Sequence, residues 1–380
     1  RFYYLSEVNM NAGRLVNWGT QLNYNPLGIS INRYANDKIG WETAYKTNIG
    51  VEVALSNGMS LNADLFKERR KNILLTRVIP ATMGIIPDVK ANLGEAEGKG
   101  IDLEFNYEKI VNNDLWLTGR GTFTYATSKA IEWEEPDYSE TPWLSRVGKS
   151  LAQNWGYIAE RLFVDDLEVA NSPTQFGTYQ AGDIKYRDIN GDGKISALDK
   201  VPIGYPTTPE INYGFGLSVG YKDIDASFFF QGSGRQSFWI DLKKTTPFLD
   251  GNSGIVGEDD GLIGQNAIIQ AFADSYWSED NPNPYALWPR LANYEIANNR
   301  ETSTWFMQDA TFLRLKSVEV GYTLPKTLTR KFFVQNLRVY LSGTNLLCWS
   351  RFKLWDPEMA GNGLGYPVQR VFNIGLTIGL

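Results

Sequence analysis

Eleven consecutive residues in the middle of the chain alternate between apolar and small or polar side chains. From 211 to 221 the sequence reads INYGFGLSVGY, and after Lys222-Asp223 the alternation resumes in IDASFFF. Successive side chains of a β-strand point to opposite faces, whereas a helix would repeat at about 3.6 residues. The pattern therefore predicts a β-hairpin with one apolar face.

Similar alternation recurs along the chain. A second predicted hairpin has strands at 47–55 and 61–65 joined through Asn57-Gly58, a strong hairpin signal. Further strands are predicted at 101–107, from near 115, and at 318–324, 337–341 and 372–380. We expect roughly ten or eleven strands of about ten residues, the length of a tilted membrane-spanning strand. One short helix is expected around 268–273.

The connections between these strands differ in length. The predicted turns are at 56–59, 112–114 and 222–223, whereas long polar stretches lie near 128–150, 165–210, 235–305 and 349–370. Short turns on one side and long loops on the other are typical of outer-membrane barrels. The chain also has 36 Gly, 20 Tyr, 19 Phe and 12 Trp, a mixture that suits strands and aromatic girdles. The predicted fold is therefore all-β, a transmembrane antiparallel β-barrel. The alternative is a secreted carbohydrate-binding β-sandwich with a dockerin-like calcium loop.

The composition excludes several classes of function. The chain has no His and a single Cys, Cys348, so it lacks the common ligands of zinc and of iron–sulfur clusters. A Ser-His-Asp or Cys-His catalytic unit is impossible without histidine, and no pair of carboxylates stands out by its spacing as a glycosidase pair. We therefore expect no enzyme. A formal charge of −6 argues against a nucleic-acid partner.

Residues 188–199 match the spacing of a calcium-binding loop. Positions 1, 3, 5, 7, 9 and 12 of an EF-hand-type loop are occupied by Asp188, Asn190, Asp192, Lys194, Ser196 and Asp199. Gly193 stands at the sixth position, where the loop turns sharply, and Lys194 would contribute its carbonyl oxygen. The alternative is a solvated turn, because Asn, Gly and Asp favour turns without any ion.

Three aromatic residues of the long loops are candidates for contact with a substrate or a partner protein. These are Trp288, Trp355 and Tyr366, whose rings can stack on sugars or peptides. The alternative is that each ring packs within its own loop.

Several motifs resemble the C-terminal part of SusC/RagA-type TonB-dependent transporters, over roughly 41–380. The most specific is DINGDGKI at 188–195, followed by IGYP at 203–206 and FFQG at 229–232. Further matches are LRLK at 313–316, GYTLP at 321–325, NLRVY at 336–340 and WDPE at 355–358.

The resemblance implies a barrel of about 22 strands, closed around a plug. Residues 1–380 would supply the C-terminal part of this barrel, and the chain opens without Met, inside alternating sequence, like a piece of a longer protein. The plug, the N-terminal strands and the segment that contacts TonB would lie outside it. The implied protein lies in the bacterial outer membrane, surrounded by lipid, and imports glycans or peptides with a SusD-like lipoprotein. A siderophore-type receptor, which would lack the motif at 188–195, is the remaining alternative.

Overall fold

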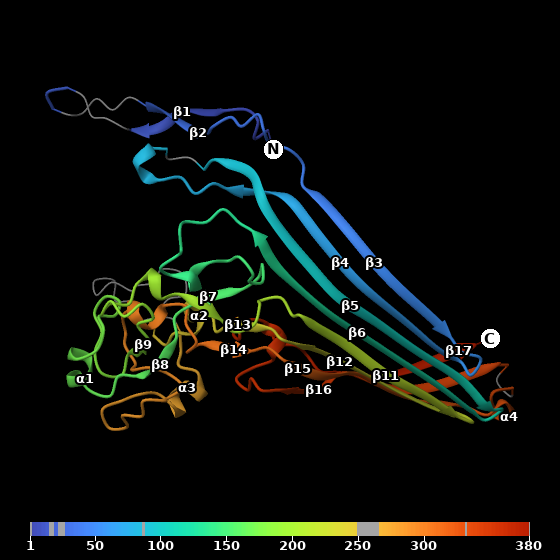
Figure 1. Ribbon diagram of the computed structural model, residues 1–380. Coiled ribbons are helices and arrows are strands. Elements are labelled where there is room, and N and C mark those ends of the chain that lie inside the picture. The colour runs from blue at the N-terminus through green and yellow to red at the C-terminus, as the bar shows by residue number, and fades with distance from the viewer. Residues whose placement is uncertain are drawn as a thin grey trace. The chain divides into compact units, whose positions relative to one another are not determined.

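Nine antiparallel strands form the main sheet, in the order β17-β16-β15-β12-β11-β6-β5-β4-β3. In this computed structural model, residues 2–14, 19–21, 27–85, 88–248, 266–330 and 333–379 are described. Neighbours in the sheet follow one another along the sequence, so the sheet is a meander (Figure 1). A single meander of this kind excludes the two-sheet sandwich considered as an alternative.

The strands of the main sheet are β3 (Thr43–Ala54), β4 (Met59–Thr76), β5 (Lys90–Asn112), β6 (Leu115–Glu132), β11 (Ile211–Tyr221), β12 (Ile224–Gly234), β15 (Phe312–Thr323), β16 (Asn336–Ser350) and β17 (Val371–Gly379). Four two-stranded sheets pair β1 (Glu7–Arg14) with β2 (Leu27–Arg33), β7 (Asn154–Gly156) with β10 (Val201–Ile203), β8 (Ala159–Leu162) with β9 (Ile184–Tyr186), and β13 (Ser237–Trp239) with β14 (Met307–Asp309). The short α-helices are α1 (Asp166–Ala170), α2 (Leu242–Thr245), α3 (Gln270–Asp274) and α4 (Lys326–Thr329).

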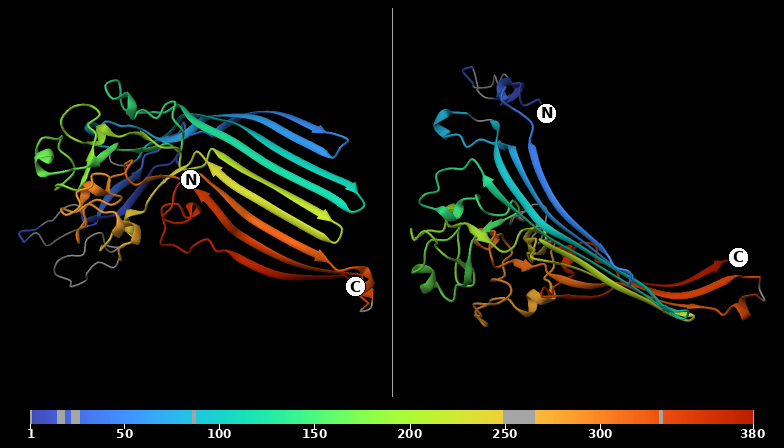
Figure 2. Two further views of the ribbon diagram at one scale, coloured as in Figure 1. Left: turned by 90° about the horizontal axis from the view of Figure 1, so that it is seen from below. Right: turned by 45° about the vertical axis from the view of Figure 1, so that its right-hand side comes forward.

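The chain divides into two compact units. Unit 1 comprises 1–48, 66–99 and 127–151, and unit 2 comprises 49–65, 100–126 and 152–380. Strands β3 to β6 contribute residues to both units. Unit 2 contains the paired strands β11, β12, β15, β16 and β17, which lie side by side in Figure 2.

The predicted hairpins are present with their tight turns. Gly58 adopts a φ of +86°, and a Cβ there would lie 1.8 Å from the Glu108 carbonyl oxygen, so only glycine fits. Lys222 also has a positive φ of 55°, as a two-residue hairpin turn requires. The register of β11 with β12 runs without interruption from Ile211–Gly234 to Tyr221–Ile224. Residues 270–274 form the short helix expected there.

Alternation along the strands gives the sheet of unit 2 two different faces. On one face, apolar side chains line a shallow hollow of about 550 Å³; they are Leu217, Val219, Ala226, Phe228, Phe230, Leu315, Val318 and Val320. On the other face, the guanidinium of Arg120 lies over the ring of Phe229, 4.8 Å from its centroid. Nearer the short turns, Arg338 donates to Asp225 (Nε–Oδ1 2.9 Å) and Glu319 (Nη2–Oε1 2.7 Å), which links β16 to β12 and β15. The apolar and polar faces agree with the sequence pattern.

Strand length was predicted correctly for part of the sheet only. Strands β11 and β12 have 11 residues each and β17 has 9, close to the expected length. Strand β5 has 23 residues, and β4 and β6 have 18 each. A tilted strand needs only about 9–11 residues to span a bilayer. The long strands therefore exceed the length that spanning a bilayer requires, and the excess lies on the side of the long loops.

Candidate functional site

The long loops of unit 2 fold into a packed layer, which we call the loop layer; it comprises 152–210, 235–248, 266–311 and 351–370. Its core contains Tyr157, Leu162, Ile184, Tyr186, Ile195, Ile240, Phe272, Trp277, Ala286, Trp288 and Phe306, all buried. The short sheets β7–β10, β8–β9 and β13–β14 hold these segments together (Figure 1). Burial on this scale means that the loops present a formed surface, since apolar contacts fix their backbone.

A buried ion pair lies at the centre of the loop layer. The carboxylate of Asp183 is fully buried, and Arg290 Nε lies 2.9 Å from its Oδ1. Asn299 Nδ2 and the Gln180 N–H also donate to this carboxylate, at 2.8 and 2.9 Å. Burial raises the pKa of Asp183 and is the largest influence, although Arg290 and the hydrogen bonds act to lower it. Such a network favours one arrangement of the loops, because the buried carboxylate keeps its charge partner and its hydrogen-bond donors only in that arrangement.

Asn298 joins the same core to the strands of the loop layer. Its side chain is buried, donates to the Ile184 carbonyl at 2.6 Å and accepts from the Phe176 N–H at 3.2 Å. The Tyr186 hydroxyl donates to the Asn298 carbonyl at 2.7 Å, and burial raises the pKa of that phenol. No pattern in the sequence indicated the importance of Asn298.

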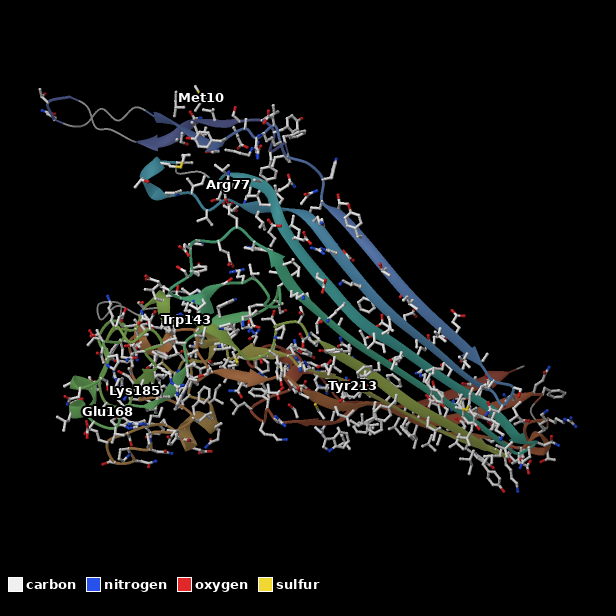
Figure 3. The ribbon with its side chains drawn as sticks, viewed as in Figure 1. Met10, Arg77, Trp143, Glu168, Lys185 and Tyr213 are labelled. Atoms are coloured by element: carbon white, nitrogen blue, oxygen red, sulfur yellow. The ribbon has the colours of Figure 1, made fainter. Side chains whose placement is uncertain are left out.

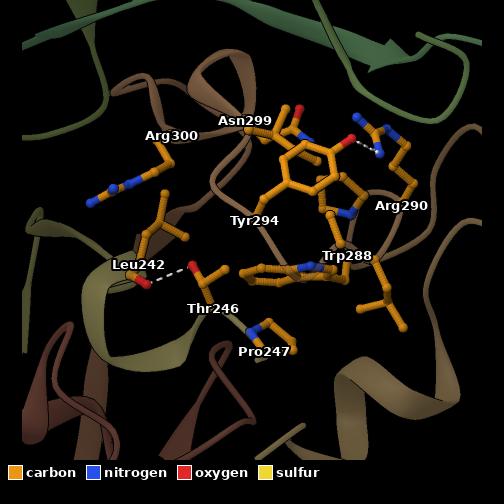
Figure 4. Close-up of a pocket in the computed structure, with 12 residues that line it drawn as sticks. Leu242, Thr246, Pro247, Trp288, Arg290, Tyr294, Asn299 and Arg300 are labelled. Atoms are coloured by element: carbon orange, nitrogen blue, oxygen red, sulfur yellow. Dashed lines mark hydrogen bonds between the residues drawn. The ribbon is translucent and has the colours of Figure 1, made fainter. Parts of the chain in front are cut away.

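A small cavity lies between α2 and the segment 288–300 (Figure 4). Its volume is about 30 Å³, and Trp288, Arg290, Tyr294 and Arg300 are among its lining residues. Arg290 Nη1 donates to the Tyr294 hydroxyl at 3.2 Å across one side. This volume accommodates a water molecule, whereas ligand pockets enclose roughly 300–1,000 Å³. The cavity is therefore a packing feature of the loop layer.

The predicted calcium-loop residues form a tight turn. Asp188 accepts the N–H groups of Gly191 and Gly193 through its two oxygens, at 2.7 and 2.8 Å. Asp199 is buried and accepts from the Ile189 and Ser196 N–H groups, at 2.8 and 2.7 Å. Other hydrogen bonds also stay within the turn. The Asn190 amide and the Lys194 N–H donate to the Asp192 carboxylate, and the Leu198 N–H donates to the Ser196 hydroxyl.

The three Asp carboxylates do not converge. Within the described part of the chain, no group of three or more Asp, Glu, Cys or His residues is placed to hold a metal. The residue types fit calcium, which prefers carboxylate and carbonyl oxygens, but binding would require Asp199 to leave its backbone partners. Calcium binding therefore stays a prediction.

The three candidate aromatic residues occupy different environments. Trp288 is 5% exposed, with ring centroids of Phe272 and Phe306 at 4.4 and 5.1 Å. Trp355 is partly buried, and its Nε1 donates to the Ala360 carbonyl at 2.8 Å. Tyr366 is 81% exposed. A role in ligand contact remains a prediction for all three, and the exposed ring of Tyr366 suits it best.

Arg314 connects the loop layer to the main sheet. Its side chain, on β15, is only 2% exposed and forms ion pairs with Asp356 at 2.5 Å and Glu358 at 2.7 Å. Both partners belong to the sequence motif WDPE and Arg314 to LRLK. The sequence showed these motifs without indicating that they meet, because forty residues of sequence separate them and only the tertiary fold pairs them.

A larger hollow lies in unit 1. It encloses about 580 Å³ and is lined by Glu42, Phe66, Glu68, Arg70, Ile73, Ala96, Glu97, Gly98, Ser128, Trp133 and Leu151. Arg70 Nη2 donates to Glu68 at 2.9 Å, and its Nη1 lies 3.7 Å from Glu42. The volume falls within the range of ligand sites. No pattern in the sequence indicated this hollow, because its lining residues come from separate segments of the chain.

Within the described residues, no helix has the length and hydrophobicity required to span a membrane.

Comparison with known proteins identifies the family. Residues 10–346 match the family model described as "TonB dependent receptor-like, beta-barrel". Two relatives from Formosa agariphila, TonB-dependent receptors P3 and P26, are each 27% identical over 92% and 96% of this chain. The chain spans 35% and 37% of their lengths.

Solved structures share the fold. The RagAB peptide transporter matches with a TM-score of 0.65 at 21% identity, and the RagAB peptide importer in its "open-open" state with 0.66 at 20% identity. Each match covers 97% of this chain and 38% of the solved chain. The SusC/RagA-type resemblance and the barrel fold predicted from sequence are confirmed. The family consists of receptors and transporters. The chain therefore belongs to the TonB-dependent receptor β-barrel family of the bacterial outer membrane.

Proposed function

We propose that residues 1–380 form the C-terminal part of the barrel of an outer-membrane nutrient importer, whose plug and N-terminal strands belong to the rest of the protein. The importer takes up glycans or peptides, is driven by the proton-motive force through TonB, and acts with a SusD-like lipoprotein at its extracellular mouth. The observation that carries this proposal is the packed loop layer, with its buried core at the ends of the barrel strands. A formed surface at the loop ends suits a mouth that holds substrate and partner.

The hollow of unit 1 supports the same function. Its acidic and basic groups, Glu42, Glu68 and Arg70, can bind polar groups of a substrate, and the ring of Trp133 can stack on it. The name of the RagAB peptide importer, a structural neighbour, suggests peptide as one substrate class.

The experiment is an uptake assay in bacteria that lack the intact protein, with labelled oligopeptides, oligosaccharides and ferric siderophores supplied separately. We expect the wild-type gene to restore uptake of one of the first two classes and a proton uncoupler to abolish it. Trp133→Ala should reduce that uptake, and Trp41→Ala, whose ring is 93% exposed, serves as the control. Uptake of ferric siderophores alone would establish the alternative receptor class.

The partner is tested separately by purifying the tagged intact protein in mild detergent. A SusD-like lipoprotein should copurify in a fixed ratio. Its absence from the complex, with uptake intact, would overturn the partner assignment and leave the transport proposal standing.

We also propose that the turn at 188–199 binds calcium as a structural ion. Position 12 is Asp199, one methylene shorter than the usual Glu, so a weak dissociation constant of about 10⁻⁴–10⁻³ M is expected. The melting temperature of the intact protein should be higher in millimolar calcium than in EDTA. The double variant Asp188→Ala, Asp192→Ala should lose this difference. A wild type that melts identically in both conditions would reduce the motif to a turn.

A further inference from the structure

Five cations lie on one face of β4, β5 and β6 in the half of these strands nearer the long loops, and we call them the basic row: Lys67, Arg69, Lys71, Lys99 and Lys129. Along β4, they continue the two-residue alternation of Leu61 and Leu65, which are 43% and 54% exposed. Along β5, Lys99 precedes Ile101 and Leu103 in the same alternation. The basic row therefore extends the apolar face of these strands toward the long loops.

Two glutamates lie among the cations and are largely covered by them. Glu97 forms ion pairs with Lys67 at 2.8 Å and with Lys129 at 3.5 Å. Glu95 forms ion pairs with Arg69 and, at 3.8 Å, with Lys71. The glutamate side chains are each 11% exposed, whereas the four cations paired with them are 44–56% exposed. Five cations against two carboxylates leave three positive charges in the basic row.

On the opposite face, ion pairs join β4 to the start of β3. There Lys46 pairs with Glu68 at 3.6 Å, and Arg70 pairs with Glu68 and Glu42 at 2.9 and 3.7 Å. Two cations meet two carboxylates, as in an ordinary surface ion-pair lattice. The surplus charge of the basic row thus lies on the face that carries the exposed leucines.

This location corresponds to the headgroup level of the membrane. In outer-membrane barrels, the apolar band faces lipid and the long loops lie outside the cell. Tyr45, 60% exposed, lies on the same face of β3 as the exposed Ile49 and Val51, and aromatic side chains of this kind mark the interface. Cations just beyond such a band meet the headgroups of the outer leaflet, where phosphate is the available anion.

We propose that the basic row binds the phosphate groups of anionic lipid headgroups in the outer leaflet. Lysine and arginine form charge-assisted hydrogen bonds to phosphate oxygens, and the surplus of three charges is then neutralised by lipid. Glu95 and Glu97 hold the cations side by side beneath the headgroups, so that neighbouring cations contact the same lipid.

The test uses the intact protein in nanodiscs of phosphatidylcholine with a minority of phosphatidylglycerol. Native mass spectrometry measures the phosphatidylglycerol that the protein retains. The triple variant Lys67→Gln, Lys99→Gln, Lys129→Gln should lower the affinity for phosphatidylglycerol by about tenfold or more. Lys67→Gln alone should lower this affinity in part. Lys46→Gln, which changes a lysine of β3 on the opposite face of the sheet, should leave the affinity unchanged. A heat-dependent gel shift verifies that each variant is folded.

Two outcomes would overturn the proposal. One is equal retention of phosphatidylglycerol by the wild type and the folded triple variant. The other is displacement of the lipid by soluble glycerol 3-phosphate at millimolar concentration, which would assign the basic row to free phosphate compounds. Retention that persists against glycerol 3-phosphate and is lost in the triple variant supports the lipid.

Discussion

Single side chains connect the loop layer to the barrel, and Arg314 shows how. Its guanidinium is buried and lies between Asp356 and Glu358 of the loop that follows β16. A buried cation of this kind holds its partners firmly, because either carboxylate would lose its counter-charge if the arginine were removed. Arg314 therefore contributes to the stability of residues 351–370, together with the packing of Phe352 against Phe238.

We predict that Arg314→Met frees this loop. Removing one partner of a buried ion pair costs on the order of 3 kcal/mol, which corresponds to about a hundredfold increase in the open population. Limited proteolysis of the intact protein should show this as faster cleavage within 351–370. Arg351→Gln is the control, because that arginine is 86% exposed and lies 3.5 Å from Asp309. Unchanged cleavage in Arg314→Met would contradict the anchoring role.

Glu168 supplies a pH-dependent contact at the same scale. Burial acts to raise its pKa, but hydrogen bonds from Lys185, the Val164 N–H and Arg161 outweigh burial, and its pKa is lowered to about 2. Lys185 Nζ lies 2.8 Å from Oε1 (Figure 3). Since the folded pKa is depressed, the contribution to stability is complete above the unfolded pKa of about 4.3. It is lost as the pH falls from there through about 2.

We predict that Glu168→Gln lowers the free energy of local unfolding around β8 and β9 by about 2 kcal/mol at neutral pH. Hydrogen exchange of the amides at 159–162 and 184–186 measures it. The difference from the wild type should vanish near pH 2, and a constant difference down to that pH would refute the linkage. Glu160→Gln is the matched control, because its partner Arg187 is 54% exposed.

At the scale of elements, the two faces of a strand predict opposite responses to charge. Leu217 on β11 lines the apolar hollow with Val219 and Phe228, whereas its neighbour Ser218 points to the other face. An arginine on the lipid face near the membrane midplane costs about 2–4 kcal/mol, and one on the lumen face costs much less.

We predict that Leu217→Arg destabilises the intact barrel by this amount and that Ser218→Arg does not. Denaturant titration in lipid vesicles, followed by the heat-dependent gel shift, compares the two variants directly. Equal losses of folded protein would mean that the assigned faces are wrong.

At the scale of the whole molecule, the edge strands of the main sheet determine whether residues 1–380 can insert into a membrane by themselves. Strands β3 and β17 are the outermost strands of the nine-stranded sheet within the described residues. On β17, Phe372 and Ile374 are 75% and 81% exposed. An open strand edge is not tolerated in lipid, where every backbone polar group needs a partner.

We therefore predict that residues 1–380 expressed alone do not insert into bilayers as a monomer. Refolding into vesicles should give aggregated or protease-sensitive material without a heat-dependent gel shift, whereas the intact protein should show the shift. A stable, heat-modifiable monomer of the isolated chain would show that it closes on itself.

The sequence by itself determined the strands, their hairpins and the two faces of the sheet. Alternation with a period of two fixes which side chains share a face, and Asn57-Gly58 and Lys222-Asp223 fix the tight turns, because these are local properties of the backbone. The motifs at 188–195, 313–316 and 355–358 were enough for the family. The length of β4 to β6 could not be predicted from the sequence, because polar and charged residues outside the membrane weaken the alternation that marks a strand.

Only the tertiary structure decided how the loops fold and which residues meet in them. Trp288 was a candidate for ligand contact from its type, and its place in the core became clear only when Phe272 and Phe306 came together around it. Arg314 with Asp356, and Asp183 with Arg290, are pairs whose members lie far apart in the sequence. Such contacts arise from the packing of distant segments, and local propensity carries no information about which segments will pack.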